Sequence, residues 1–385
     1  MQIHSKKIVI VTSYAKSLID FRLNLIIDLM ARGARVVALA PDVDGNTRYR
    51  LSALGVEVID IRLSRAGMNP FMDIVSTYEV YKKLRLLKPD IVFAYFIKPV
   101  IFGLVAAWLA GVKRRIVMIE GLGYVFAYKT NDLSLGRQTL KAIVISLYYF
   151  ALRFAHKVIF LNADDLREFV KMSLVDEIKS INIGGIGIDL DRWCSVPFVH
   201  GEQITFLMVA RLLREKGVAE YAEAAERVKS KYPKTNFLLL GGLDDNPGTI
   251  SLDVVSAWNN RGILTWYGHV PVAEHLRVTS VYVLPSYREG VPVSTMEAMA
   301  VGRPIITTDV PGCRETVVDG INGFMVPAKD AVRLAEKMIW FIENPSSIAT
   351  MGAASRKMAE EKFDVHKINA KLMQIIFCDE NEKIV

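Results

Sequence analysis

The sequence predicts an α/β protein built from two doubly wound domains in tandem. Short β-branched runs alternate with amphipathic helical stretches along the 385-residue chain, which is typical of parallel sheets covered by helices. Residues 181–200, INIGGIGIDLDRWCSVPFVH, interrupt this alternation, and it restarts after them. The composition, 51% hydrophobic and 23% charged, is that of a globular protein, and the length suits two domains that each bury a core.

Each predicted strand is a short apolar run, and the predicted helices fill the stretches between them. In the first half, strands are expected at 7–13, 34–41, 56–61, 90–96, 115–121 and 157–162. Helices are expected there at 20–32, 71–87, 99–111, 134–155 and 164–173. In the second half, strands are expected at 204–212, 237–242, 263–270, 281–286, 303–309 and 323–327. We place one domain at 1–190, a second at 191–362, and at 363–385 a C-terminal helix that packs back toward the first domain.

Cysteine usage and hydropathy bear on the cellular setting. Cys194, Cys313 and Cys378 are odd in number and far apart, so they predict neither a disulfide framework nor a zinc site and fit a reducing cytoplasm. The N-terminal residues form a short apolar run without a cleavage site, which predicts a strand and not a signal peptide. The longest apolar run, 142–152, is well short of the roughly 20 residues that a bilayer helix needs, so no transmembrane helix is expected.

Charge is unevenly distributed along the chain. Residues 1–200 hold 27 Lys and Arg against 18 Asp and Glu, whereas residues 201–385 hold 21 against 23. The basic excess lies entirely in the first half, which suggests an anionic surface or partner there, such as nucleic acid or acidic lipid. No nucleic-acid recognition motif accompanies it, so nucleic-acid binding is not expected.

The stretch YREGVPVSTMEAMAVGRPII, 287–306, is a junction between a buried strand and a helix that ends at Gly302. Glu289 and Glu297 stand eight residues apart here, at a helix start whose N–H groups suit an anion or a polar ligand. An alternative is purely structural. Ser294 and Glu297 fit an S-x-x-E capping box, and Glu289 fits a solvated loop charge.

A second strand-to-helix junction is ARLLREKG, 210–217. Arg211, Arg214 and Lys216 crowd the positive end of the following helix, where cations are unfavourable unless an anion binds. Glu220 and Glu223 offset part of this charge, so a phosphate site and a solvated basic loop both remain open. Taken together, cations for a diphosphate and carboxylates for vicinal hydroxyls in one α/β domain indicate a sugar-nucleotide site.

The second half resembles the GT4 retaining glycosyltransferases, whose GT-B fold has two Rossmann-like domains facing a central cleft. The resemblance rests on ARLLREKG, LLLGG, YGHV and PSYREGVPVSTMEAMAVGRPIITTDVPGCRETVVDGINGFMVP. It implies that Glu289 holds hydroxyls of the donor sugar, Glu297 the ribose of the nucleotide, and Arg211 with Lys216 the diphosphate. It also implies that the backbone amides of Gly290, Val291 and Pro292 contact the sugar and phosphate. His269 and Val270 are implied to lie against the base.

The first half resembles the family more loosely and is expected to bind the acceptor. The loop TSYAKS lacks the family's glycine pair, so Ala15, Lys16 and Ser17 are expected to supply its contacts. Glu120 stands where many members carry a histidine, and we take it as the candidate for positioning the acceptor hydroxyl. GLGYVF and YFIKPVIFG resemble the subgroup that builds bacterial surface polysaccharides on polyprenyl-diphosphate carriers. Lys98 either faces an acceptor phosphate or is a surface lysine at a helix start.

Residues 137–157, RQTLKAIVISLYYFALRFAHK, combine basic ends with an apolar middle. Such a segment forms either a membrane-surface helix or a sheet-covering helix, and the basic first half favours a peripheral membrane contact nearby. The strings GGIG and GLG do not complete a G-x-G-x-x-G fingerprint, so a dinucleotide dehydrogenase is not expected.

The expected protein is a retaining hexosyltransferase or N-acetylhexosaminyltransferase that uses a nucleotide sugar, and a UDP-sugar is the expected donor. Its acceptor is a polyprenyl-diphosphate-linked saccharide at the cytoplasmic face of the membrane, in O-antigen, capsule or exopolysaccharide synthesis. The resemblance implies no metal and no cofactor. The alternatives are a UDP-sugar 2-epimerase of the same fold and an inactive sugar-nucleotide-binding scaffold.

Overall fold

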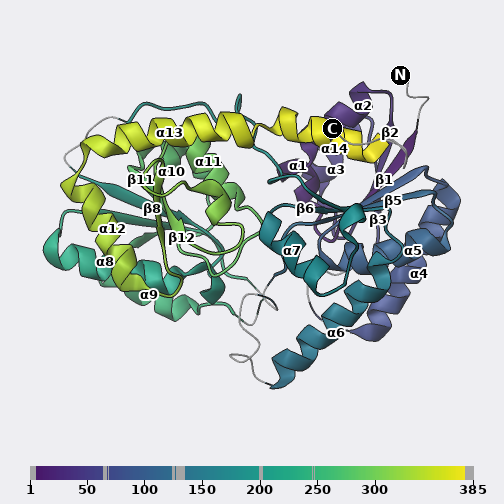
Figure 1. The fold of residues 1–385 in the computed structure, drawn as a ribbon, viewed down its shortest axis with the longest axis horizontal. Coiled ribbons are helices and arrows are strands. Elements are labelled where there is room, and N and C mark those ends of the chain that lie inside the picture. The colour runs from purple at the N-terminus through teal and green to yellow at the C-terminus, as the bar shows by residue number, and fades with distance from the viewer. Residues whose placement is uncertain are drawn as a thin grey trace. The chain divides into compact units, whose positions relative to one another are not determined.

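A computed structural model describes residues 6–63, 67, 69–123, 126, 135–198, 203–244, 246 and 248–377. These residues form two compact units (Figure 1). One unit comprises the described residues of 1–122, 133–185 and 366–385, and the other comprises those of 123–132 and 186–365.

The first unit is a seven-stranded sheet with strand order β3-β2-β1-β4-β5-β6-β7, in which all pairs are parallel. Its strands are β1 Lys7–Val11, β2 Arg35–Ala40, β3 Glu57–Asp60, β4 Ile91–Tyr95, β5 Arg114–Ile119, β6 Lys157–Phe160 and β7 Ser180–Asn182. Its helices are α1 Ser17–Asp20, α2 Leu23–Ala31, α3 Gly45–Ala53, α4 Pro70–Leu87, α5 Leu104–Leu109, α6 Leu135–Leu152, α7 Ala163–Lys171 and α14 Val365–Phe377. Short helical turns are η1 Pro99–Gly103, of π type, and η4 Glu177–Lys179.

The second unit is a six-stranded parallel sheet with strand order β10-β9-β8-β11-β12-β13. Its strands are β8 Thr205–Val209, β9 Asn236–Leu240, β10 Thr265–Trp266, β11 Val281–Leu284, β12 Ile305–Thr308 and β13 Gly323–Val326. Its helices are α8 Val218–Lys231, α9 Leu252–Asn260, α10 Val272–Val278, α11 Val293–Val301, α12 Ala331–Glu343 and α13 Ser346–Lys362. Two 3₁₀ turns are η5 Arg214–Lys216 and η6 Arg314–Thr316.

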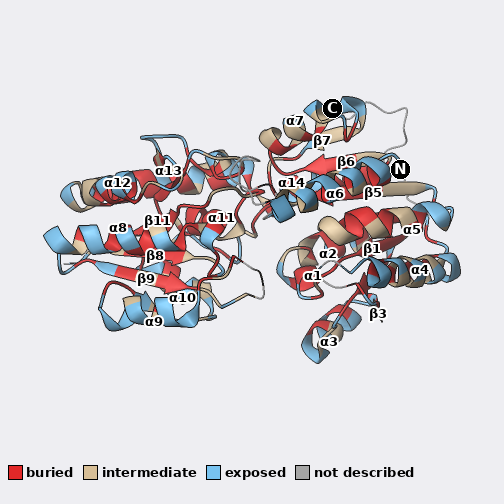
Figure 2. Cartoon of the chain, turned by 90° about the horizontal axis from the view of Figure 1, so that it is seen from below, coloured by how far each residue is buried: buried red, intermediate tan, exposed pale blue. Residues whose placement is uncertain are grey.

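Central strands are buried on both faces in each unit, because helices cover both sides of the sheets (Figure 2). The register explains the continuous apolar runs: Ile8 of β1 lies opposite Val36 on one side and Ile91 on the other. Such strands have no solvent-facing side and therefore read as unbroken hydrophobic runs.

Helix α14 completes the first unit although it comes last in the chain. Ile368, Leu372 and Ile376 of this helix are buried. Asn369 Nδ2 donates to Asp28 Oδ2 at 2.7 Å, and a guanidinium nitrogen of Arg114 donates to the carbonyl of residue 375 at 2.7 Å.

Three helical segments of the first unit differ from the prediction. The expected helix 20–32 is two helices, α1 and α2, because the chain breaks its helical conformation at Phe21 and Arg22. Helix α3 was not predicted, since GNTRYRLSA is polar and buries only Thr47 and Leu51. The expected helix 99–111 begins with the π-helical turn η1.

Candidate functional site

In the second unit, Arg211, Lys216 and Glu289 of the predicted donor site come from the loops that follow two neighbouring strands, β8 and β11. The chain winds outward from β8 in one direction and from β11 in the other, so the sheet has its topological switch point between them. Ligands of open α/β sheets bind at this point, beyond the carboxyl ends of the strands. The loop after β8 carries Arg211 and Lys216, and the loop after β11 carries Glu289.

Lys216 and Glu289 form an ion pair across the switch point. The Lys216 ammonium lies 2.6 Å from Oε1 and 2.7 Å from Oε2 of Glu289. Ser286 Oγ also donates to Glu289 Oε1 at 2.7 Å. The side chains are 19% and 11% exposed, so both are largely desolvated and charge-assisted hydrogen bonds hold them in place. The prediction assigned Lys216 to the diphosphate and Glu289 to the sugar hydroxyls. The structure adds that the two side chains contact each other.

Glycines allow the loops of this site to approach one another. Gly217 has φ of +75°, and a Cβ there would lie 2.1 Å from the Pro285 carbonyl oxygen. Gly312 has φ of +78°, and a Cβ there would lie 2.3 Å from the carbonyl oxygens of both Glu289 and Gly290. Only glycine fits these positions without moving the backbone that carries Glu289.

Arg211 pairs with a residue that the sequence analysis did not single out. One of its guanidinium nitrogens lies 2.6 Å from Asp244 Oδ2, and its side chain is 44% exposed. Asp244 lies after β9, in a polar loop without a recognisable motif, so no sequence signal marked it. His269 is exposed and Val270 is half-buried. The His269 Cβ lies 3.7 Å from the position that a Cβ on Gly242 would occupy.

Helix α11 begins at Val293, and two expectations for the residues around its start are wrong: the capping box of Ser294 and the backbone amide of Pro292. The capping-box interpretation is wrong because Ser294 lies inside the first turn and α11 has no side-chain cap. Ser294 Oγ instead donates to the Val209 carbonyl at 3.2 Å and accepts from the Tyr282 hydroxyl at 2.6 Å. Pro292 precedes the helix and has no N–H, so the prediction of a backbone amide from it is wrong.

The remaining predicted residues of this junction lie close to the Glu289 loop. Gly290 and Val291 are buried, and Glu297 is half-buried on α11. Burial raises the pKa of the Tyr282 hydroxyl, and the charges of Glu297 and Glu289 raise it further. Tyr282 therefore stays protonated, and its hydroxyl donates a hydrogen bond to Ser294 Oγ. This bond fixes the start of α11.

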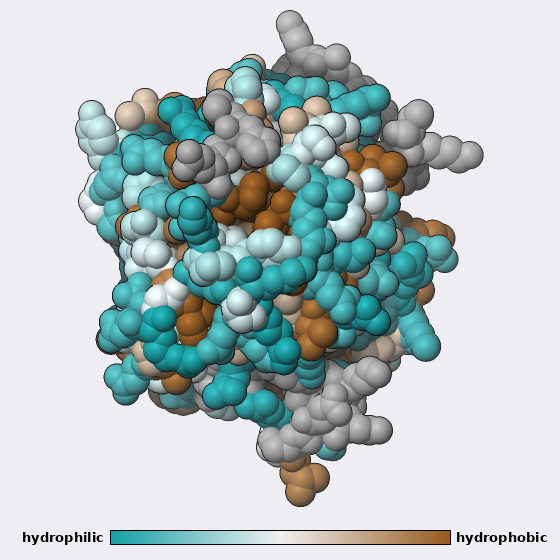
Figure 3. Space-filling model, turned by 90° about the vertical axis from the view of Figure 1, so that its left-hand side faces the viewer, coloured by the Kyte–Doolittle hydropathy of each residue, from teal (hydrophilic) through white to brown (hydrophobic). Residues whose placement is uncertain are grey.

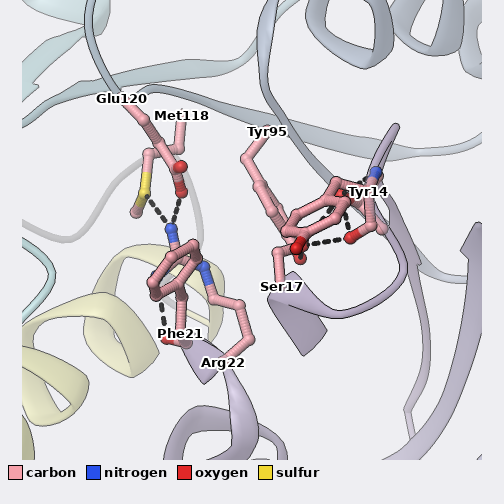
Figure 4. Close-up of polar contacts among 8 residues, drawn as sticks. Tyr14, Ser17, Phe21, Arg22, Tyr95, Met118 and Glu120 are labelled. Carbon is pink, nitrogen blue, oxygen red and sulfur yellow. Dashed lines mark hydrogen bonds and ion pairs between the residues drawn. The ribbon is translucent and has the colours of Figure 1, made fainter. Parts of the chain in front are cut away.

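In the first unit, a buried arginine and Glu120 form an ion pair that the sequence did not predict (Figure 4). Arg22 is 1% exposed and lies after α1, whereas Glu120 follows β5 and its side chain is 13% exposed. The Arg22 guanidinium also donates to the Phe21 carbonyl at 3.0 Å and lies 4.7 Å from the centroid of the Tyr95 ring. Burial lowers the pKa of Arg22 to about 10. The pair fixes the Glu120 carboxylate and leaves it the more exposed partner.

Ser17 is part of the same cluster. Its hydroxyl lies 2.8 Å from the Tyr95 hydroxyl and donates to the Tyr14 carbonyl at 2.5 Å. Its backbone N–H donates to the same carbonyl at 3.1 Å, and the residue is fully buried. The Ser17 amide is therefore engaged within the turn and stabilises the loop. Lys16, next to it, is exposed.

Lys98 lies just before η1 and pairs with Asp73 of α4. The two charged atoms are 2.7 Å apart, and the side chains are 11% and 10% exposed. Lys98 is thus not a solvated surface lysine. Phe96, two residues earlier, has φ of +72°, a conformation that non-glycine residues adopt rarely and mostly at constrained sites.

Two Asp-x-Asp sequences occur in the chain, and both have structural partners. Asp44 caps α3 through Thr47 N–H at 2.9 Å, and Asp189 accepts from the backbone N–H groups of Asp191 and Arg192. Within the described ranges, no group of three His, Cys, Asp or Glu side chains is arranged to hold a metal ion. Of the helices that the structure describes, none combines the length and apolar character needed to span a bilayer.

Two family descriptions match the chain, one on each half. Residues 195–358 match the family described as "Glycosyl transferases group 1", and residues 22–179 match the "Glycosyl transferase 4-like domain". A Campylobacter jejuni protein named N,N'-diacetylbacillosaminyl-diphospho-undecaprenol alpha-1,3-N-acetylgalactosaminyltransferase is 32% identical over 341 residues, which cover 85% of this chain and 87% of that protein. An Escherichia coli protein named UDP-Gal:alpha-D-GlcNAc-diphosphoundecaprenol alpha-1,3-galactosyltransferase is 28% identical and covers 67% of each chain.

Solved structures share the fold at low sequence identity. Anabaena HepE in complex with UDP-glucose has a TM-score of 0.76 at 16% identity and covers 96% of this chain and 99% of that one. Crystalline TarM has a TM-score of 0.74 at 12% identity and covers 98% and 100%. These likenesses confirm the GT-B fold expected from the sequence. Together with the family matches on both halves and the 32% identical relative, they show that the chain belongs to the group 1 glycosyltransferases.

Proposed function

We propose that this glycosyltransferase moves a hexose or N-acetylhexosamine, with retention, from a UDP-linked donor to a polyprenyl-diphosphate-linked saccharide. The Campylobacter and Escherichia relatives are named for undecaprenyl-diphosphate-linked acceptors, and the second is named for a UDP-linked donor. Another relative, from Staphylococcus aureus, is named for capsular polysaccharide biosynthesis. These names support a place in O-antigen, capsule or exopolysaccharide assembly.

The observation that carries the donor half of the proposal is the Lys216–Glu289 pair beside the exposed Arg211. In the proposed complex, Lys216 and Arg211 bind the diphosphate, and the Glu289 carboxylate accepts hydrogen bonds from sugar hydroxyls. Cations held at the point where negative charge develops stabilise the departing diphosphate, which is the task of a divalent ion in other transferases. We therefore expect turnover without an added metal or cofactor. Glu297 is proposed to bind the ribose, and His269 with Val270 the base.

In the acceptor half, Glu120 is proposed to position the attacking hydroxyl. That oxygen bonds to the anomeric carbon as the bond from this carbon to the diphosphate oxygen breaks. The hydroxyl attacks from the face that the diphosphate leaves, which preserves the anomeric configuration, and its proton passes to the leaving phosphate oxygen. Lys98 and Lys16 are proposed to contact the acceptor. A lipid-linked acceptor also implies peripheral association with the inner face of the cell membrane.

The test is transfer from a panel of radiolabelled UDP- and GDP-sugars to a membrane extract containing polyprenyl-diphosphate saccharides, with EDTA present. The wild type is compared with Glu289→Ala and with Glu343→Ala, because Glu343 forms an exposed ion pair with Lys231 in the same unit. We expect one UDP-sugar to label the lipid fraction, Glu343→Ala to match the wild type, and Glu289→Ala to fall by about 10²-fold or more. Release of epimer or free sugar without lipid labelling would indicate an epimerase. No turnover with any donor would indicate an inactive sugar-nucleotide-binding scaffold.

A further inference from the structure

Helix α4 has a reversed distribution of polarity in its first half. A helix that covers a sheet normally buries apolar side chains and exposes polar ones. Here Asp73 and Ser76 are buried, whereas Phe71 is 72% exposed and Ile74 is 67% exposed. The buried polar groups are satisfied, since Asp73 pairs with Lys98 and Ser76 Oγ donates to the Met72 carbonyl at 2.7 Å. Specific partners therefore account for the burial of these polar groups. They do not account for the exposure of Phe71 and Ile74.

The exposed stripe continues along the helix and becomes basic. Tyr78, Lys82 and Arg85 follow Phe71 and Ile74 at helical spacing, and all three are exposed. Lys82 Nζ lies 4.5 Å from the centroid of the Tyr78 ring. The acidic residue next to this stripe, Glu79, is half-buried and accepts from a backbone N–H at 3.2 Å. The stripe thus joins large apolar side chains to two exposed cations.

The apolar end of this stripe lies at the carboxyl edge of the first sheet. The Lys98–Asp73 bond ties the first turn of α4 to the segment that follows β4. Along its other side α4 packs against α5 and η1, so the stripe faces away from the unit (Figures 1 and 2). Other exposed apolar groups occur in the same unit, such as Trp108 of α5 and Phe150 of α6. On the face shown in Figure 3, hydrophobic side chains form several patches between hydrophilic ones.

We propose that the outward stripe of α4, formed by Phe71, Ile74, Tyr78, Lys82 and Arg85, docks on an anionic phospholipid membrane. Phe71 and Ile74 enter the boundary between headgroups and acyl chains, Tyr78 lies at headgroup level, and the two cations bind lipid phosphates. An anionic bilayer matches the stripe in charge and in its combination of apolar and aromatic groups. Docking helps sugar transfer only if the acceptor is lipid-linked, so that consequence rests on the proposed function. Binding to the membrane does not depend on it.

Vesicle sedimentation tests the proposal without measuring activity. Full-length protein is mixed with vesicles of phosphatidylcholine alone or of equal parts phosphatidylcholine and phosphatidylglycerol. The variants are Phe71→Ser with Ile74→Ser, and Lys82→Gln with Arg85→Gln. The control is Ile321→Ser with Lys357→Gln, which removes one exposed apolar group and one exposed cation from the second unit.

We expect the wild type and the control to bind the anionic vesicles and to bind phosphatidylcholine weakly. Loss of the two cations should weaken anionic binding by about 25-fold, since each contributes about fivefold. Loss of the two apolar groups should weaken binding by about tenfold or more. Unchanged binding of both variants would overturn the proposal. So would a loss of self-association in gel filtration with vesicle binding intact, because the stripe would then be an interface between copies.

Activity separates this inference from the proposed function. With a short-chain, water-soluble acceptor, the stripe variants should transfer sugar at the wild-type rate, whereas with vesicle-bound acceptor they should be slower. Absence of transfer by the wild type would contradict the proposed function and leave the binding result standing.

Discussion

Each unit has an ion pair between segments that follow its strands, but the two pairs expose opposite partners. In the second unit the cation is the more exposed member, with Lys216 at 19% and Glu289 at 11%. In the first unit the carboxylate is more exposed, with Glu120 at 13% and Arg22 at 1%. The exposed partner decides which ligand a pair can accept: an exposed ammonium suits a diphosphate, and an exposed carboxylate suits a hydroxyl group. Under the proposed function, the same pairing chemistry therefore serves two different substrates.

Removal of the exposed cation of the second unit should abolish most of the sugar transfer. Lys216→Ala leaves the Glu289 carboxylate without its partner and the proposed diphosphate without a cation. We expect sugar transfer to fall by about 10²- to 10³-fold, measured as kcat with the labelled donor. Lys231→Ala is the matched control, because Lys231 also pairs with a glutamate but is exposed and far from the β8 and β11 loops in sequence. A comparable loss in both variants would show that the effect is not specific to the site.

Removal of the buried cation of the first unit should act on stability. Arg22→Met leaves Glu120 largely desolvated and without its partner, and we expect the free energy of unfolding to fall by about 3 kcal/mol. Urea denaturation measures this change. The double variant Arg22→Met with Glu120→Gln should recover most of the loss, because no unpaired charge then remains. If the double variant is as unstable as the single one, packing of Arg22 and not the ion pair is responsible.

A buried thiol, that of Cys313, lies near the Lys216–Glu289 pair and should resist alkylation. Burial raises the pKa of Cys313 from its ordinary value of 9.0 to about 12, and the nearby Glu289 charge adds to this. Alkylation at mildly alkaline pH should therefore modify the exposed Cys194 but not Cys313 in the folded protein, as peptide mass spectrometry can measure. Cys378 lies outside the described residues.

The sign of the linked stability change follows from the same pKa. Between about pH 9 and 12 an unfolded chain releases the Cys313 proton while the folded chain keeps it, so the free energy of unfolding should fall as pH rises through this window. Replacement by serine should remove that slope. Rapid labelling of Cys313 without unfolding would contradict its burial.

The sequence predicted the sheets better than it predicted the ion pairs. Unbroken apolar runs identified β1, β4, β8 and β11, and the glycine-bounded junctions after β8 and β11 pointed to Lys216 and Glu289. Arg22 was not found, because an arginine in an amphipathic stretch resembles a surface residue and its partner Glu120 is 98 positions away. The segment 137–157 suggested either a membrane-surface helix or a sheet-covering helix. Helix α6 buries Val144 and Tyr148 but exposes Tyr149 and Phe150, so its membrane contact stays a prediction.

The reversed face of α4 shows why periodicity alone missed it. Apolar residues recur at helical spacing whether they face the sheet or the solvent, so the pattern predicts a helix but not its orientation. The orientation includes the buried Asp73–Lys98 pair, which is a contact between separate elements and has no signal in the periodicity.

Helix α14 bears on how the protein is made. Residues 366–377 leave the ribosome after residues 186–365, a delay of about 10 to 40 s at bacterial and eukaryotic elongation rates. Throughout that interval the surface around Asp28 and Arg114 lacks the helix that covers it. The second unit, in contrast, has nearly all of its residues available as soon as they are synthesised. The unit that begins synthesis first is therefore the unit whose residues are complete last.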